Sequence, residues 1–198
     1  MSSYLRDYSE VSHSINNSSG CEKIDLPRIV VVGNQSSGKS SVLELITGVD
    51  FLPRGTGIVT KVPLEVTLIH TEGEDVYAMF RHTKGKRFDD FKEVEREIEN
   101  KTRELCGEEG KVVNKPIYLT IYSKNVPNLL LIDLPGLVDV DTNDTYEGVK
   151  DDIDRLVHHY VEPENTIIVV VSPVIIDSAN CKGLSKAKKV DPEMRRTI

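Results

Sequence analysis

The sequence has 198 residues, 38% of them hydrophobic, which is enough for one α/β domain with a sizeable core. Its formal net charge of −7 argues against a general nucleic-acid binder. No apolar run reaches membrane-spanning length and the N-terminus lacks a signal-peptide core, so we expect a cytoplasmic protein.

The N-terminal region, residues 1–23, is predicted to form a separate helix and linker. Apolar and small residues at 5, 8, 12 and 15 follow approximate helical spacing, and the stripe ends in the breaker cluster 16–20. Residues 24–198 are predicted to form one further domain.

A phosphate-binding loop is predicted directly after the first expected strand, Arg28–Val32. The residues from Gly33 to Ser40 satisfy the spacing G-x-x-x-x-G-K-S, and a helix of about 39–47 follows and stops at Gly48. The glycines allow successive backbone N–H groups to form an anion nest at a helix N-terminus. We expect Lys39 to reach the β- and γ-phosphates and Ser40 to ligate Mg²⁺. The alternative is an ordinary Gly/Ser-rich turn.

A second loop should close on the γ-phosphate, and the segment Gly55–Thr60 is the candidate. Its glycines permit large dihedral changes, and the Thr60 hydroxyl is available for Mg²⁺. On local grounds, a threonine at the beginning of a strand is an equally good interpretation of Thr60.

The remaining elements predict a doubly wound, mostly parallel α/β sheet, because near-continuous apolar strands alternate with helices. An amphipathic helix is expected at 89–106, with Asp89 or Asp90 near its N-cap, and another at about 148–161. The expected strands are 62–70, 76–82, 117–122, 129–132 and a fully buried strand at 166–171.

A second motif, Asp133-Leu134-Pro135-Gly136, follows the apolar strand 129–132. An acid at the end of a buried strand can hold Mg²⁺ through water, and the amide of Gly136 can contact the γ-phosphate. Asp-x-Pro-Gly also forms ordinary turns. The position after a phosphate-binding loop and an apolar strand favours the nucleotide interpretation.

Together the runs 33–44, 52–60 and 133–136 resemble the GTPase domain of the dynamin superfamily, which includes dynamins, mitochondrial-fission dynamins and Mx proteins. The resemblance covers residues 24–198. It implies a P-loop NTPase fold of the dynamin type that hydrolyses GTP to GDP and phosphate and thereby drives self-assembly and membrane remodelling or fission. It also implies Mg²⁺, a monovalent cation (Na⁺ or K⁺), pairing of GTPase domains, and recruitment to membranes or mitochondria through regions outside this chain.

The resemblance also assigns catalytic roles. Small GTPases orient water with a glutamine after D-x-x-G, but that position here is Leu137, which cannot hydrogen-bond to water. The family pattern implies that Gln35 positions the water with help from Thr60. A monovalent cation held by Ser36 and the backbone of Gly55 and Gly57 would do the work of an arginine finger. In the pairing of two domains, Asp177 matches the residue that reaches across.

By this resemblance the catalytic residues are Gln35, Ser36, Lys39 and Thr60, and Ser40, Thr60 and Asp133 hold Mg²⁺. The nucleotide-binding set shares the two loops and the acidic turn: Gly33, Asn34, Gln35, Ser36, Ser37, Gly38, Lys39, Ser40, Ser41, Arg54, Gly55, Gly57, Asp133 and Gly136.

Two departures from the family pattern stand out. The guanine-reading T-K-x-D would follow the segment 190–198, so we expect a GTPase domain that is incomplete at its C-terminus. The segment 136–144 lacks the basic and proline-rich switch sequence of the family. The alternative functions are a non-hydrolysing nucleotide-binding or interaction fragment and an ATPase.

Overall fold

The computed structural model of the chain describes residues 28–54, 60–108, 110–138, 146–175 and 181–198. The helix expected within residues 1–23 lies outside these ranges.

The described residues form strands and helices that follow the sequence pattern closely, in the order β1 (Arg28–Val32), α2 (Lys39–Thr47), β2 (Leu64–His70), β3 (Tyr77–Phe80), the 3₁₀ helix η1 (Arg81–Thr83), β4 (Arg87–Phe88), α3 (Phe91–Cys106), β5 (Ile117–Ser123), β6 (Leu129–Asp133), α4 (Val149–Val161), β7 (Thr166–Val170) and α5 (Lys182–Val190).

The strands form one seven-stranded sheet in the order β4-β3-β5-β2-β6-β1-β7. The α/β fold expected from the sequence is confirmed, whereas the sheet, which we expected to be mostly parallel, is mixed. Strand β1 runs parallel to β6 and β7, and β2 runs parallel to β5. The pairs β2–β6, β3–β5 and β3–β4 are antiparallel. Because β1 and β6 are parallel neighbours, the segments that follow them leave the sheet at the same edge.

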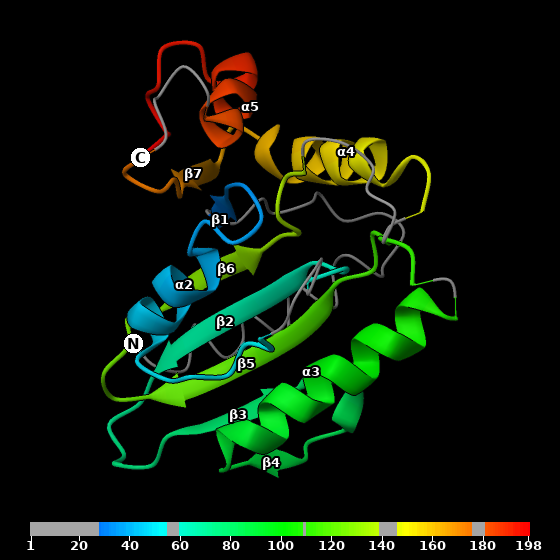
Figure 1. The fold of residues 1–198 in the computed structure, drawn as a ribbon. Helices are drawn as coiled ribbons and strands as arrows, with labels where there is room; N and C mark the ends of the chain where they lie inside the picture. The colour runs from blue at the N-terminus through cyan, green and yellow to red at the C-terminus, as the bar shows by residue number, and fades with distance from the viewer. Residues whose placement is uncertain (1–27, 55–59, 109, 139–145, 176–180) are drawn as a thin grey trace, which may run out of the picture.

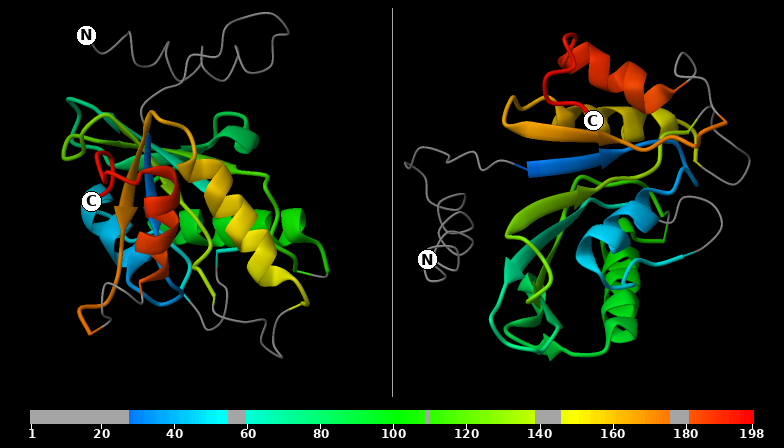
Figure 2. Two further views of the ribbon diagram at one scale, coloured as in Figure 1. Left: turned by 90° about the horizontal axis from the view of Figure 1, so that it is seen from above. Right: turned by 90° about the vertical axis from the view of Figure 1, so that its left-hand side faces the viewer.

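Helices cover both faces of the sheet (Figures 1 and 2). On one face, α2 and α3 contribute Leu43, Val94 and Ile98 to a core that includes Leu64 and Leu119. On the other face, α4 and α5 pack with β1, β6 and β7 around a second core that includes Ile153, Val157 and Ala187. Two independent cores hold β1 and β6 from both sides, so the sheet edge beside the phosphate-binding motif rests on a rigid base.

Strand boundaries differ from the prediction where proline or an edge position intervenes. Strand β2 begins at Leu64 and not at Val62, because Pro63 has no N–H to donate to a ladder. Strand β7 is not fully buried as predicted, because it lies at the edge of the sheet, and Ile167 is 36% exposed. Its outer edge is partly paired, since Ile168 N donates to Arg196 O and Val170 N donates to Ile198 O, both at 2.8 Å.

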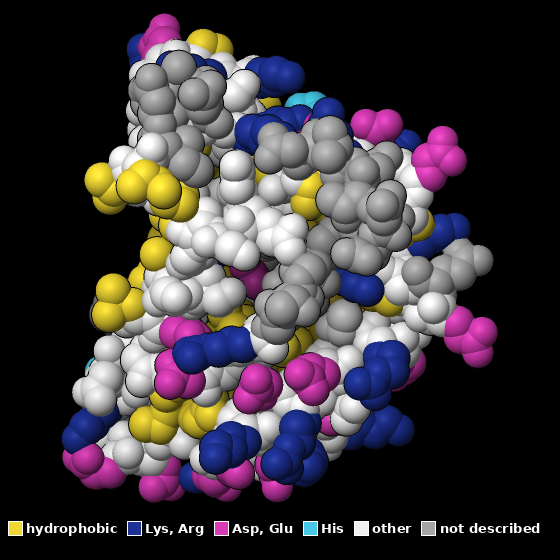
Figure 3. All heavy atoms as spheres, in the orientation of Figure 1, with side chains coloured by type: hydrophobic (Ala, Val, Ile, Leu, Met, Phe, Trp, Pro, Cys, Tyr) yellow, Lys and Arg dark blue, Asp and Glu magenta, His cyan; other side chains and the backbone are white. Residues whose placement is uncertain are grey.

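Helix α3 is amphipathic, as its sequence pattern predicts. Its side chains Val94 and Ile98 are buried, and the Asp90 carboxylate caps its N-terminus by accepting from Lys92 N at 2.9 Å. Figure 3 shows interspersed acidic and basic side chains over the part of the surface where α3 lies. Within the described ranges, no helix is both long enough and apolar enough to cross a membrane.

Candidate functional site

The loop between β1 and α2 adopts the tight conformation that its glycines predict. Gly38 has a φ of 98° and Ser36 has a φ of 59°, so the chain turns twice through the left-handed region before α2 begins. Ser37 N donates to Asn34 O at 3.2 Å and closes the turn. Gly33 is required by close packing, because a Cβ there would lie 2.3 Å from Val171 O.

The N-terminus of α2 has backbone N–H groups that lack a partner within the helix. The first helical bond at this end runs from Val42 N to Gly38 O at 3.1 Å, so the amides of Lys39, Ser40 and Ser41 precede the helical ladder. The Lys39 ammonium folds back over the loop and donates to Asn34 O at 3.0 Å and to Gly33 O at 3.3 Å. These donors and the helix dipole make the loop a site suited to an anion.

The turn after β6 docks directly onto this loop. Leu137 N donates to Gly33 O and Gln35 N donates to Leu137 O, both at 3.0 Å. Gly136 lies against Gln35, because a Cβ at Gly136 would be 2.7 Å from Gln35 Cα and 3.0 Å from Lys39 Nζ. The two motifs recognised in the sequence are therefore joined by backbone hydrogen bonds. The contribution of the Leu137 backbone was not predicted, because a side-chain pattern carries no signal for main-chain pairing.

Asp133 lies beneath the loop at the end of β6 and is almost fully buried. Its Oδ2 accepts a hydrogen bond from Thr60 Oγ1 at 3.3 Å, whereas Oδ1 has no partner among the described residues. Burial raises the pKa of Asp133 to about 6, although Lys39, the Thr60 hydroxyl and the Leu134 amide oppose the shift. Burial likewise lowers the pKa of Lys39, against the attraction of Asp133.

The residues at this site fit a magnesium ion with bound phosphates. An orphaned, buried carboxylate oxygen gains from a cation within a few ångströms, because opposite charge favours the ionised form. Hydroxyl and carboxylate oxygens from Thr60, Ser40 and Asp133 are the ligand type that Mg²⁺ takes in such sites. Thr60 and Asp133 are two of the residues predicted to bind Mg²⁺, and the structure brings them into hydrogen-bond contact. Thr60 precedes β2, and Asp133 ends β6.

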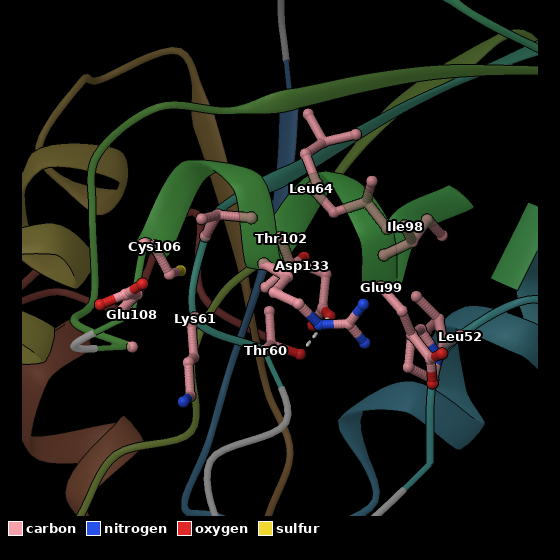
Figure 4. A pocket seen from close by; sticks show the side chains of 16 residues that line it. Leu52, Thr60, Lys61, Leu64, Ile98, Glu99, Thr102, Cys106, Glu108 and Asp133 are labelled. Carbon is pink, nitrogen blue, oxygen red and sulfur yellow. Dashed lines mark hydrogen bonds between the residues drawn. The ribbon is translucent and has the colours of Figure 1, made fainter. Parts of the chain in front are cut away.

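A cavity of about 440 Å³ opens beside Thr60 and Asp133 (Figure 4). Helix α3 provides one wall through Ile98, Thr102 and Cys106, and the segment leading into β2 provides the other. Figure 4 shows the hydrogen bond between Thr60 and Asp133 at the cavity, which is therefore continuous with the proposed magnesium ligands.

Other predicted residues have different surroundings. Arg54 is 70% exposed and pairs with Glu44 at the end of α2, not with the phosphate-binding loop. Gly55, Gly57 and Asp177 lie outside the described residues, so the predicted monovalent-cation site is represented only by Ser36.

Helix α5 adds contacts that sequence reasoning missed. The Lys182 ammonium donates to Val138 O at 3.1 Å, just after the acidic turn. Gly183 packs closely, because a Cβ there would lie 2.9 Å from Val170 Cγ1 and 3.5 Å from Gly33 Cα. A glycine in the first turn of a helix was the only available signal, and it does not by itself indicate a partner.

Comparison with known proteins identifies relatives of this chain. The sequence profile of the dynamin family matches residues 29–198. The chain is 42% identical to Dynamin-1-like protein of Danio rerio over 195 residues, which covers 92% of this chain and 28% of that protein. It is 46% identical to Dynamin-A of Dictyostelium discoideum over 188 residues, with 92% and 22% covered.

A third relative is Dynamin-1 of Homo sapiens, which is 47% identical over 175 residues, with 88% of this chain and 20% of that protein covered. The chain thus spans between a fifth and three tenths of the length of these relatives. From the family match and these identities, the chain belongs to the dynamin family and carries its nucleotide-binding GTPase domain region.

Proposed function

We propose that this chain binds Mg²⁺ and GTP on the loop Gly33–Ser40 and hydrolyses GTP to GDP and phosphate. The observation that carries the proposal is the docking of the acidic turn onto the loop. The bonds from Leu137 N to Gly33 O and from Gln35 N to Leu137 O join the turn that follows the buried Asp133 to the loop that leads to Lys39 and the N-terminus of α2. Each of these groups stabilises a polyphosphate or its metal ion.

In this proposal Lys39 and the first amides of α2 bind the β- and γ-phosphates. Ser40, Thr60 and Asp133 would hold Mg²⁺, which when bound neutralises charge on the phosphate oxygens. Gln35 orients a water molecule whose oxygen attacks the γ-phosphorus as the bond to the bridging oxygen breaks. Leu137 cannot perform this task, because its side chain is apolar and is buried in a core. Ser36 and the backbone of Gly55 and Gly57 would hold a monovalent cation, which would supply further positive charge near the phosphates.

The proposal extends to self-association through GTPase domains, with Asp177 at the contact. Support comes from Val174 and Ile175, which stand shortly before Asp177 in the sequence and are 101% and 93% exposed. Exposed apolar side chains that adjoin one another favour a surface that contacts a partner. Cytoplasmic location, recruitment to membranes or mitochondria, and membrane remodelling or fission also belong to the proposal and rest on family membership alone.

Single-turnover hydrolysis tests the assignment of Gln35. We expect Gln35→Ala to retain nucleotide affinity and to slow hydrolysis of GTP by about a hundredfold, because orientation of the water matters mainly in the transition state. Rapid-quench measurement of labelled GTP, with a parallel binding titration, separates the two quantities. Loss of hydrolysis in Leu137→Ala with full activity in Gln35→Ala would overturn the assignment. Equal hydrolysis of ATP by the unmodified chain would favour an ATPase.

A further inference from the structure

Glu44 is a buried acid in α2 whose carboxylate accepts three hydrogen bonds. Its side chain is only 7% exposed. Oε1 accepts from Phe51 N at 3.3 Å and from Leu52 N at 3.2 Å, and Oε2 accepts from the Arg54 guanidinium at 2.9 Å. Burial of a carboxylate costs free energy unless the carboxylate is hydrogen-bonded. The bonds from residues 51–54 offset this cost for Glu44.

The segment held by Glu44 is otherwise fixed by packing. Gly48 ends α2 in the left-handed region and donates its N–H to Glu44 O at 2.9 Å. Phe51 and Leu52 bury their side chains in the core beside α2. The peptide from 48 to 52 is therefore bound to α2 through both the backbone and the carboxylate of the same residue, Glu44.

Glu44 also lies on the same helix face as a residue of the phosphate-binding turn. Ser40 precedes it by four residues, one helical turn. At the other end of the arrangement, Arg54 is followed by the segment 55–59 and then by Thr60, which donates to Asp133 at 3.3 Å. Glu44 thus connects the helix that carries Lys39 and Ser40 to the beginning of the segment that ends at Thr60.

We propose that Glu44 is a positioning residue for the GTPase reaction: its carboxylate fixes residues 51–54, which precede Thr60 in the chain, to the helix that carries Lys39 and Ser40, and thereby supports the position of Thr60 at Asp133. The inference rests on the proposed function. Glu44 touches neither substrate nor metal and acts through the backbone of Phe51 and Leu52 and through Arg54.

A second acid on Arg54 provides a matched control. Asp50 lies 3.6 Å from the Arg54 guanidinium, but its side chain is 85% exposed and that of Arg54 is 70% exposed. Solvent screens such a pair strongly, so it contributes little. Asp50→Asn removes a negative charge beside the same arginine without touching the buried hydrogen bonds.

Hydrogen exchange measures the strength of the hydrogen bonds from Phe51 N and Leu52 N to Glu44, here called the tether, and needs no nucleotide. In Glu44→Gln we expect the amides of Phe51 and Leu52 to exchange at least about tenfold faster, because an amide group loses the charge that strengthens these bonds. Peptides from β6 report global stability and should stay unchanged. Asp50→Asn should match the unmodified chain throughout. Unchanged exchange at Phe51 and Leu52 in Glu44→Gln overturns the tether.

Kinetics then reads the consequence. We expect Glu44→Gln to slow single-turnover GTP hydrolysis about tenfold while its affinity for a fluorescent GDP analogue stays within about threefold, since the phosphate-binding loop is intact. Unchanged hydrolysis, or an equal loss of GDP affinity, overturns the positioning role. If Glu44→Gln fails to fold, Glu44→Asp replaces it, because the shorter side chain keeps the charge but no longer reaches the amides of Phe51 and Leu52, and we expect about threefold slower hydrolysis with GDP affinity retained. An unmodified chain that binds no nucleotide contradicts the proposed function, whereas the exchange result in Glu44→Gln is independent of it.

Discussion

The crossing of the phosphate-binding loop and the acidic turn has no room for side chains at Gly33 and Gly136. At Gly136 the obstruction is mainly backbone, since a Cβ would lie 2.7 Å from Gln35 Cα and 2.8 Å from Gln35 N. Backbone atoms cannot rotate away as a long side chain can. A glycine at position 136 therefore allows the turn after Asp133 to lie against Gln35 and Lys39. This close contact explains the glycine in the motif Asp133-Leu134-Pro135-Gly136.

Replacement of Gly136 by alanine tests the close approach. We expect Gly136→Ala to lower the free energy of unfolding by about 1–3 kcal/mol, as overpacking of a dense site does. Urea denaturation of the two chains measures the difference. Gly73→Ala serves as control, because a Cβ there meets nothing within 4 Å, and it should change stability by less than about 0.5 kcal/mol. Equal effects of the two substitutions would refute the packing argument.

At the scale of elements, the sequence predicts most of what lies at the site. Strand β1 and helix α2 follow from the apolar run, the phosphate-loop spacing and Gly48. Strand β4 was not predicted, because its two residues, Arg87–Phe88, show no periodicity. The antiparallel pairing of β2 with β6 was not predicted either, since strand neighbours are chosen by tertiary packing.

The site residues likewise fall into those that a sequence motif predicts and those whose contacts depend on tertiary packing. The positions of Lys39 and Asp133 can be predicted because the two motifs have fixed spacing after an apolar strand, whereas the local sequence around Thr60 fits a threonine at the beginning of a strand equally well. Glu44 escapes prediction, because a glutamate within a helix is usually solvated and nothing in its spacing indicates that Phe51 and Leu52 return to it. Sequence patterns report local periodicity and motif chemistry, whereas this contact depends on how the chain folds back.

A half-buried acid on β2, Glu65, contacts α4 and gives a pH-dependent prediction. Burial raises the pKa of Glu65 above its ordinary value of 4.5, although Arg28 and the Tyr160 hydroxyl oppose the shift. Tyr160 Oη lies 3.4 Å from Glu65 Oε1. Because the folded state then binds more protons than the unfolded state above pH 4.5, stability falls as pH rises through the folded pKa.

The expected outcome is that Glu65→Gln removes this component of the pH dependence. The stability of the variant relative to the unmodified chain should increase as pH rises from about 4 to 7, where the unfolded carboxyl ionises first. Urea denaturation at a series of pH values measures the difference between the two chains. A difference that is constant with pH, or that decreases, would show that the folded pKa of Glu65 is not raised.

At the scale of the molecule, two cores on opposite faces of one sheet position the ends of β1 and β6 side by side. The chain spans between a fifth and three tenths of the length of the dynamin-family relatives that it matches. Helix α5 also lies close to the phosphate-binding loop, because Gly183 packs near Gly33. Lys182 of the same helix donates to Val138 O after the acidic turn. These contacts predict that the loop binds a nucleoside triphosphate.

Titration of a fluorescent GTP analogue measures this binding. The unmodified chain and Lys39→Ala are compared in the presence of Mg²⁺. The Lys39 ammonium is buried at the loop, and loss of a charge-assisted contact to phosphate costs about 1.5–3 kcal/mol. We expect saturable binding by the unmodified chain and affinity weaker by about ten- to a hundredfold in Lys39→Ala. Circular dichroism verifies that the variant is folded. Equal affinity of the two folded chains for the analogue would contradict the assignment of the phosphate-binding loop.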